Sequence, residues 1–220
     1  MKFMEYVLAR QTMVSQQLRT TGVLNEKVLA VMGTLPREAF VASTWQTVAY
    51  ADTYLPIGHE QVMLEPKEQG RIVQALAIQP QDVVLEIGTG TGYFTAILAQ
   101  LAKFVYSIEI FPDFVTTAQA RLQQLNIDNV QLINDDAYLG WQKYMPYDVI
   151  CITAAVPEYP ENFKMGLKVG GRLCAIVGNA PAMYCLLITR TGDTTWEEVV
   201  LFETSVPLII SVEKSNSFKF

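Results

Sequence analysis

Three glycines at alternate positions, Gly88, Gly90 and Gly92, mark the stretch of this chain best suited to binding a ligand. They follow an apolar run that contains one acid, Glu86, and such a run is typical of a strand buried on both faces of a parallel sheet. Glycine permits a tight turn and lets a ligand approach the backbone closely. Residues 93–102 carry apolar side chains at helical spacing. The sequence therefore predicts the strand, loop and helix with which α/β sheets build a nucleotide-sized pocket.

The spacing of the glycines argues against the commonest nucleotide sites. In the dinucleotide fingerprint the third glycine stands one residue further on, where this chain has Tyr93, and the Lys-Ser/Thr ending of a phosphate-binding loop is missing from the sequence. A carboxylate at Glu86 would repel a polyphosphate but attract a cation, and S-adenosylmethionine carries an amino group and a sulfonium. A plain glycine turn and a dinucleotide site are the alternatives. The residues of this stretch expected to bind the methyl donor are Glu86, Gly88, Thr89, Gly90, Thr91 and Gly92.

Acids also follow the next two predicted strands. Glu109 comes directly after an apolar run, about where a parallel α/β fold places a carboxylate that accepts both hydroxyls of a ribose. After the following run we expect Asp136, with Ala137, to meet the adenine amino group. The alternatives are a solvated strand end at Glu109 and an ordinary acidic turn at Asp136. Ile110, next to Glu109, completes the predicted donor-binding residues.

Two other stretches supply candidates for a substrate site. Residues 46–70 mix turn formers and aromatics without a clear period, which is typical of a loop that covers a site. This segment holds the single histidine of the chain, His59, which either binds substrate or only hydrogen-bonds the loop. Thr153, Ala154 and Ala155 end a further predicted strand, where small side chains leave room for a substrate.

Composition and charge narrow the class of protein. The chain has 220 residues, of which 50% are hydrophobic, enough for one well-packed domain. Its net charge is −6 and its basic residues are scattered, so we expect no nucleic-acid partner. The three cysteines lie in apolar runs without metal-ligand spacing, so we expect reduced core thiols in a cytoplasmic protein and no metal. Because the sequence has neither a membrane-spanning run nor a signal peptide, we expect no membrane contact. We also expect a monomer or weak dimer.

The order of the expected elements predicts an α/β protein. N-terminal helices come first, one of them capped by Asn25 and stopped by the Leu35-Pro36 pair. Strands and helices then alternate, and a final pair of strands around residues 191–193 is typical of a hairpin. An antiparallel pair that closes a parallel sheet makes the sheet mixed. We expect a single domain 1–220, with N-terminal helices and an active-site loop in 1–78, the donor-binding core in 79–210 and a tail in 211–220.

In motifs spread over most of its length the chain resembles the protein-L-isoaspartate O-methyltransferases. Residues 84–93 are similar to the donor-binding motif of that family, and residues 13–19, 35–41, 55–58, 153–158 and 170–173 resemble its other landmarks. The resemblance implies a Rossmann-like class I fold: a mostly parallel seven-stranded sheet with helices on both faces and an N-terminal helical extension. It implies S-adenosyl-L-methionine as donor and S-adenosyl-L-homocysteine as product. It also implies methylation of the α-carboxylate of L-isoaspartyl residues in damaged proteins, after which the ester collapses to a succinimide that partly reopens to aspartate.

The chain departs from this family in the segment that contacts the acceptor. Where the family usually has Gln-Thr-Ile-Ser-Gln-Pro, residues 61–66 read Gln-Val-Met-Leu-Glu-Pro, so both hydroxyls are lost. Leu64 stands at the position of the serine that the family implicates in catalysis. In this segment the chain resembles a divergent bacterial branch with a Gln-Val-Met-Leu loop. The residues expected to bind substrate are His59, Val62, Met63, Leu64, Thr153, Ala154 and Ala155.

Methyl transfer to a carboxylate needs alignment more than it needs a base. The carboxylate is already ionised at neutral pH, and good alignment supplies roughly 7–11 kcal/mol. Losing one hydrogen bond to a charged group costs about 1.5–3 kcal/mol, and backbone N–H groups near Met63 and Leu64 could still hold the acceptor. Three functions therefore stay open: isoaspartyl carboxyl methylation, methylation of a different peptide or small molecule, and donor binding without turnover.

Overall fold

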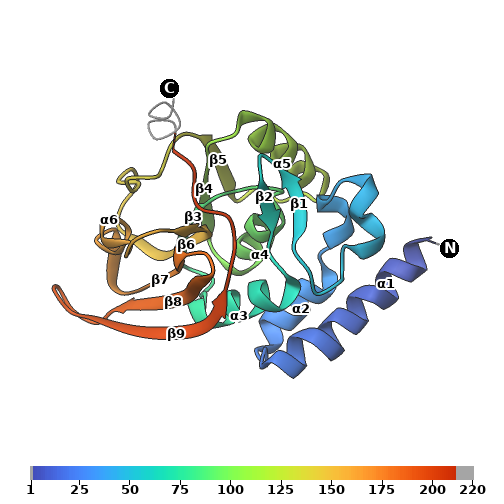
Figure 1. Ribbon diagram of the computed structural model, residues 1–220, viewed down its shortest axis with the longest axis horizontal. Coiled ribbons are helices and arrows are strands. Elements are labelled where there is room, and N and C mark those ends of the chain that lie inside the picture. Colours follow the sequence, from blue (N-terminus) through green and yellow to red (C-terminus); the bar gives the residue numbers. More distant parts are fainter. Residues whose placement is uncertain (1, 212–220) are drawn as a thin grey trace.

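A seven-stranded sheet lies at the centre of the protein, as the computed structural model, which describes residues 2–211, shows in Figure 1. Its strands are β3 (Val83–Ile87), β4 (Phe104–Glu109), β5 (Val130–Asn134), β6 (Tyr147–Val156), β7 (Leu167–Asn179), β8 (Ala182–Arg190) and β9 (Trp196–Thr204). The strand order is β5-β4-β3-β6-β7-β8-β9. Pairs from β5 to β7 are parallel, and β8 pairs antiparallel with both of its neighbours. The mixed sheet and the closing hairpin are as predicted.

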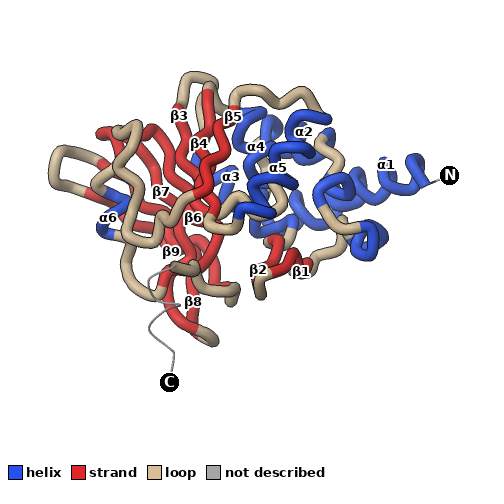
Figure 2. Tube along the Cα trace, turned by 90° about the horizontal axis from the view of Figure 1, so that it is seen from above, coloured by secondary structure: helices blue, strands red, loops and turns tan. Residues whose placement is uncertain are grey.

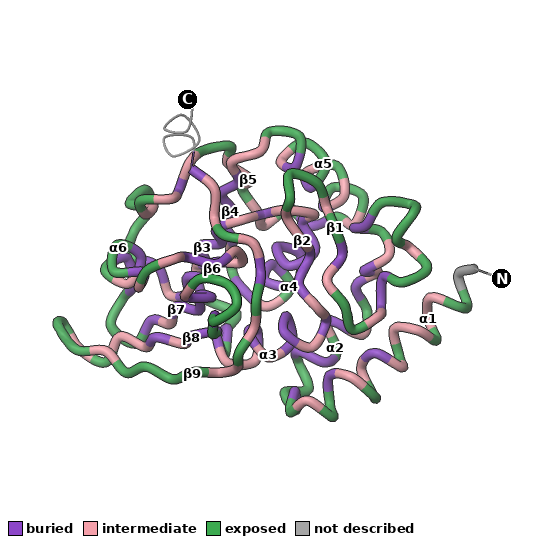
Figure 3. The backbone as a smooth tube through the Cα atoms, in the orientation of Figure 1, coloured by how far each residue is buried: buried purple, intermediate pink, exposed green. Residues whose placement is uncertain are grey.

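Helices cover the two faces of this sheet unequally. Most lie on one face with the N-terminal segments, whereas the short α6 lies on the other (Figure 2). The helical segments are α1 (Lys2–Thr12), η1 (Met13–Leu18), η2 (Arg19–Thr21), α2 (Glu26–Thr34), η3 (Arg37–Phe40), η4 (Ser43–Val48), α3 (Pro66–Leu76), α4 (Tyr93–Leu101), α5 (Pro112–Gln124) and α6 (Glu161–Lys164). Figure 3 shows that buried backbone gathers in the sheet and in α4, while the edge strand β9 is intermediate or exposed.

Local chemistry fixes several element ends where the sequence predicts them. Asn25 precedes α2, and its side-chain oxygen accepts hydrogen bonds from the N–H groups of Lys27 and Val28. Pro112 occupies the first turn of α5, where a missing N–H costs nothing. Among residues 2–211, no helix has the combination of length and apolar character that crossing a membrane requires.

The segment expected to be an irregular loop instead contains a two-stranded hairpin, β1 (Leu55–Gly58) and β2 (Gln61–Met63). His59 and Glu60 form its turn with φ of 50° and 57°, in the left-handed region that short hairpin turns require. Strands of four and three residues are too short to show a two-residue period. That is why the pattern of the sequence missed them.

A strap formed by residues 205–211 crosses the end of β6, and it was not predicted. Ala155 N–H donates to Pro207 O at 3.0 Å, and Ile209 N–H donates to Ala155 O at 2.7 Å. In Figure 1 this segment, in red, rises from β9 toward the C-terminus. The rest of the predicted tail, residues 212–220, lies outside the described residues.

Candidate active site

A cavity opens where β3, β4, β5 and β6 end, beside the hairpin β1–β2, and we call it the strand-end cavity. The carboxyl ends of parallel strands are where α/β sheets bind ligands, because the loops there diverge. Its walls come from the loops after these strands, the hairpin, the start of α5 and the strap. They are formed by Ile57, Gln61, Val62, Ile87, Gly88, Gly90, Ile108, Glu109, Ile110, Phe111, Phe114, Asp135, Ala137, Thr153, Ala154, Ile209 and Ile210.

The glycine loop between β3 and α4 has a backbone shape that favours glycine. Gly88, Gly90 and Gly92 have φ of 94°, 51° and 85°. A Cβ added at Gly88 would lie 2.5 Å from Thr153 Oγ1, and one added at Gly90 would lie 3.1 Å from Ile57 Cδ1. The loop therefore forms a narrow cradle in which a ligand can touch the backbone itself.

Glu109 ties this cradle to the end of β4. Its Oε2 accepts the N–H of Gly90 at 2.8 Å and its Oε1 accepts the N–H of Phe111 at 3.0 Å. Only 5% of the residue is exposed, and burial raises the pKa of its carboxyl. Each carboxylate oxygen retains a second lone pair. Glu109 can therefore fix the loop and still accept hydroxyl groups from a ligand in the cavity.

Glu86 lies beneath the loop, fully buried. Its Oε2 accepts hydrogen bonds from Thr95 Oγ1 and Ser107 Oγ, both at 2.6 Å, and Ser107 Oγ in turn lies 2.6 Å from Thr89 Oγ1. Burial raises the pKa of Glu86 to about 8, so the group is largely protonated at neutral pH. The structure thus places Glu86 as a support of the loop. It offers a cationic ligand neither an exposed oxygen nor a full charge, so the predicted attraction between Glu86 and a cationic donor is absent.

A second cavity, the hairpin cavity, lies between the hairpin, the glycine loop and α3. It shares Ile57, Val62, Gly88, Gly90 and Thr153 with the strand-end cavity, so the two adjoin. Its other walls are Met63, Leu64, Gln69, Thr89, Thr91 and Phe94. The strand-end cavity can therefore hold one ligand along the strand ends. The end of that ligand that lies at the shared residues would face a second molecule bound in the hairpin cavity.

Most of the predicted site residues meet in these two cavities. The strand-end cavity is lined by the predicted residues Val62, Gly88, Gly90, Glu109, Ile110, Ala137, Thr153 and Ala154. The hairpin cavity adds Met63, Leu64, Thr89 and Thr91. Five predicted residues, His59, Glu86, Gly92, Asp136 and Ala155, line neither.

Asp136, Ala155 and Gly92 lie outside both cavities, and each makes its contacts elsewhere. Asp135 lines the strand-end cavity, whereas Asp136 accepts hydrogen bonds from Tyr138 N–H at 2.8 Å and Ser211 Oγ at 2.9 Å. Ala155 is fully buried and binds the strap through its backbone. A Cβ at Gly92 would lie 3.0 Å from Ala118 Cβ, so this glycine serves the packing of α4 against α5.

His59 fastens the tip of the hairpin to α5. Its ring stacks on Phe111 with centroids 3.9 Å apart and planes 8° apart, and its Nε2 lies 3.0 Å from Asp113 Oδ2. This hydrogen bond from His59 lowers the pKa of Asp113. Phe111 also lines the strand-end cavity. His59 therefore acts at the edge of the site, through its neighbours.

Arg37 is an interior residue for which the sequence predicts no role of its own beyond the family landmark 35–41. It is fully buried, and its Nε and Nη2 donate to Ala49 O and Leu64 O, each at 2.7 Å. Its Nη1 donates to Gln69 Oε1, and its guanidinium lies 5.0 Å from the ring centroid of Tyr93. Burial lowers the pKa of Arg37 to about 10, so it stays charged at neutral pH. The signal in the sequence was a pair of charged residues, Arg37 and Glu38, within the otherwise apolar stretch 35–41.

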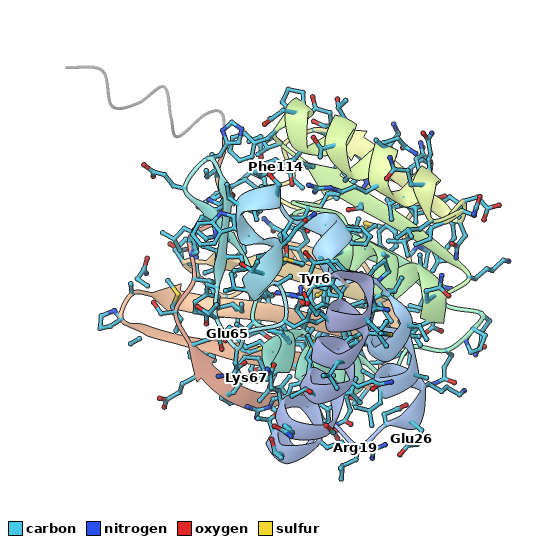
Figure 4. The ribbon with its side chains drawn as sticks, turned by 90° about the vertical axis from the view of Figure 1, so that its right-hand side faces the viewer. Tyr6, Arg19, Glu26, Glu65, Lys67 and Phe114 are labelled. Carbon is cyan, nitrogen blue, oxygen red and sulfur yellow. The ribbon has the colours of Figure 1, made fainter. Side chains whose placement is uncertain are left out.

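Charged contacts also anchor the chain directly after Leu64. Lys67 Nζ lies 2.9 Å from Glu65 Oε2 and 2.8 Å from Asp52 Oδ2. Figure 4 shows Glu65 and Lys67 near one another, with Phe114 further along the same side of the molecule. Hydrogen bonds to these acids raise the pKa of Lys67. The chain that follows Leu64 in the wall of the hairpin cavity is therefore held by two ion pairs.

A mixed sheet with this strand order, a glycine loop after β3 and an acid at the end of β4 define a class I methyltransferase of the Rossmann-like type. The chain belongs to the family described as Protein-L-isoaspartate(D-aspartate) O-methyltransferase (PCMT), whose family model matches residues 9–213.

Relatives and solved structures agree with this placement. A protein-L-isoaspartate O-methyltransferase of Magnetococcus marinus is 40% identical over 84% of this chain and 81% of its own length. One from Xanthomonas oryzae pv. oryzae is 40% identical over 88% and 86%. A solved protein-L-isoaspartate O-methyltransferase shares the fold with a TM-score of 0.80 at 24% identity, covering 94% of this chain and 69% of its own. A Plasmodium falciparum crystal structure in complex with S-adenosyl-L-homocysteine has a TM-score of 0.77 at 19% identity, with coverages of 91% and 98%.

Proposed function

We propose that this protein transfers a methyl group from S-adenosylmethionine to the α-carboxylate of L-isoaspartyl residues in damaged proteins. One observation carries the proposal, together with the family to which the chain belongs. The strand-end cavity and the hairpin cavity adjoin at Gly88, Gly90 and Thr153. A donor lying along the strand ends would thus present its methyl group beside the segment that ends at Leu64.

The residues of the strand-end cavity fit this donor. The glycine cradle admits close backbone contact, Glu109 has free lone pairs for the ribose hydroxyls, and Asp135 and Ala137 stand where the base would lie. When the donor is bound, a carboxylate oxygen of the acceptor bonds to the methyl carbon while the carbon–sulfur bond breaks and its electron pair goes to sulfur, so no proton is transferred.

The protein's part in this step is alignment and exclusion of water. Val62, Met63 and Leu64 make the hairpin side of the site apolar, and their segment is fixed by Arg37 at Leu64 O. An acceptor carboxylate is ionised at neutral pH, so neither cavity needs a basic side chain. Alignment of this kind supplies roughly 7–11 kcal/mol when it is good.

The decisive test is methyl transfer from labelled S-adenosylmethionine to an L-isoaspartyl peptide, beside its aspartyl twin of the same sequence. We expect label on the first peptide only. Calorimetry on the same sample establishes that the donor binds. Donor binding without label on the isoaspartyl peptide contradicts the proposed function.

We also propose that the protein works in the cytoplasm as a monomer or weak dimer, without a nucleic-acid or membrane partner. Cys151, Cys174 and Cys185 are buried free thiols, which suits a reducing compartment, and the net charge of −6 disfavours contact with phosphate backbones. We propose a single domain for the whole chain, because one hydrophobic core joins residues from Met13 to Val206. Size-exclusion chromatography with light scattering tests the oligomeric state.

A further inference from the structure

The hairpin cavity contains a side-chain amide close to the position where the family has hydroxyl groups. Val62 and Leu64 offer no hydrogen bond from their side chains, but Gln69, on the second turn of α3, also lines this cavity. Gln69 is 2% exposed. Burying a primary amide is costly unless its polar atoms find partners. Both the oxygen and the nitrogen of the Gln69 amide therefore need hydrogen-bond partners.

One end of that amide is fixed by Arg37. A guanidinium has five N–H donors and no acceptor, so the atom facing Arg37 Nη1 must be the amide oxygen, Oε1. The usual ambiguity between the oxygen and nitrogen of a glutamine is thereby removed on chemical grounds. The nitrogen, Nε2, carries two N–H donors and lies on the other branch of the planar amide. Within residues 2–211 it makes no hydrogen bond.

The other polar side chains of the cavity have partners in or under the glycine loop. Thr153 Oγ1 donates to Gly88 O at 2.8 Å, and Thr89 Oγ1 pairs with Ser107 Oγ at 2.6 Å. Thr91 Oγ1 accepts the N–H of Tyr93 at 3.3 Å and belongs to the loop itself. Gln69 differs from these because it comes from the acceptor side and is oriented by a cation.

Arg37 is suited to holding this amide in one orientation. Its bonds to Ala49 O and Leu64 O leave the guanidinium no freedom to turn, and Arg37 is itself fully buried. A cation that donates to an amide oxygen draws electron density from the nitrogen and strengthens its N–H groups as donors. The same side chain thus fixes the Leu64 backbone and the Gln69 head group.

We propose that Gln69 holds the acceptor carboxylate through its Nε2–H groups, in place of the hydroxyl lost at Leu64, and that Arg37 is the positioning residue that orients it. This inference rests on the proposed function and names a group that binds its substrate. The ligand class is a carboxylate, which accepts from an N–H donor without any proton transfer.

Gln69→Glu is the sharpest test, because it separates a structural role from a binding role. A carboxylate at this position keeps the contact with Arg37 and makes it an ion pair, so we expect the melting temperature to stay at or above that of the native protein. It replaces an N–H donor with an acceptor that repels the substrate carboxylate. We expect kcat/KM for the isoaspartyl peptide to fall at least thirtyfold, with donor affinity within threefold of the native value.

Three further variants complete the experiment. Gln69→Met removes the donor without adding a charge, and we expect a loss of about 10–150-fold, the range for one hydrogen bond to a charged group. Leu64→Ser in the Gln69→Met background restores a hydroxyl and is expected to recover at least threefold. Gln74→Glu is the matched control, because Gln74 lies on the same helix but outside both cavities. Its Oε1 accepts the N–H of Leu24 and its Nε2 donates to Gly22 O. Losing the second hydrogen bond should lower stability but leave kcat/KM unchanged.

The role of Arg37 is tested by a double-mutant cycle. If Arg37 acts through Gln69, Arg37→Lys lowers kcat/KM in the native background but adds little to Gln69→Met, whereas independent structural losses would add. Undiminished kcat/KM in Gln69→Glu, or donor affinity falling in parallel with it, overturns the inference and leaves the proposed function standing. A native protein that transfers no methyl group overturns the proposed function, and calorimetry with the isoaspartyl peptide then decides whether Gln69→Glu still weakens its binding.

Discussion

The donor side and the acceptor side of this site are held in place by different kinds of contact. On the donor side, Glu109 binds the N–H of Gly90, only 19 positions away, and Ser107 binds Glu86, 21 positions away. On the acceptor side, Arg37 reaches Gln69 across 32 positions, and His59 reaches Asp113 across 54. The first set belongs to one strand–helix–strand unit and to its backbone. The second depends on individual side chains from distant segments, so it can change while the fold is kept.

The largest effect should follow from filling the glycine cradle. In Gly90→Val the first added carbon lies 3.1 Å from Ile57 Cδ1 at a φ of 51°, so both the backbone and the cavity are strained. We expect donor affinity, measured by calorimetry, to fall by at least a hundredfold. Gly170→Val is the matched control, because Gly170 has a φ of 82° with open space around it. Equal donor affinity in the two variants would show that the donor does not bind in the strand-end cavity.

A smaller loss is expected at the carboxylate that ties the cradle to β4. Glu109→Gln replaces an acceptor with an N–H donor opposite one of the two backbone N–H groups that Glu109 now accepts. One lost hydrogen bond to a charged group corresponds to a decrease in donor affinity of about 10–150-fold. Glu197→Gln, on the exposed face of β9, is the control and should bind the donor as the native protein does. If Glu109→Gln left donor affinity unchanged, the ribose would have to bind elsewhere.

The contrast between the two sides also explains what could be predicted from the sequence. The glycine spacing and the order of strands are local signals, and they were sufficient for the sheet and for the strand–loop–helix unit around Gly88. That this loop and Glu109 bind the donor stays a prediction. The pairing of Arg37 with Gln69 was not predictable, because nothing in two residues 32 positions apart indicates that they touch. The sequence predicts a ligand contact for Asp136, whereas the structure places Asp135 in the wall of the strand-end cavity. The spacing of apolar residues does not define the end of β5 to within one residue, so the two neighbouring acids could not be told apart.

Glu86 sharpens the comparison because it supports the donor loop without touching either cavity. Burial raises its pKa from an ordinary 4.5 to about 8. Between these values the unfolded chain ionises while the folded protein keeps its proton, so stability is lost as pH rises, by up to about 1.4 kcal/mol per pH unit. Glu86→Gln cannot ionise. We therefore expect its melting temperature, relative to the native protein, to improve by several degrees between pH 5 and pH 8, with donor affinity changed threefold at most.

A flat difference in melting temperature over this pH range would mean that Glu86 is ionised in the folded protein. A large loss of donor affinity in Glu86→Gln would instead mean that the carboxyl acts on the ligand directly. Asp148→Asn is a useful control, since lysine and arginine neighbours and a backbone N–H lower the pKa of Asp148. Its stability contribution is present above the ordinary pKa of an aspartate and is lost as pH falls, which is the opposite sign.

The smallest effect is expected at His59, on the exposed tip of the hairpin. His59→Phe keeps a ring that can stack on Phe111 and loses only the contact with Asp113, which is exposed to solvent and therefore screened. We expect its KM for the isoaspartyl peptide to equal that of the native protein, and His59→Ala, which also loses the stacking, to raise KM about twofold. If His59→Ala weakened peptide binding as strongly as Glu109→Gln weakens donor binding, the contacts of the hairpin tip would matter as much as those of the glycine cradle. The contrast between a donor side fixed by backbone contacts and an adaptable acceptor side would then be wrong, because a single exposed ring on the acceptor side would have as large an effect.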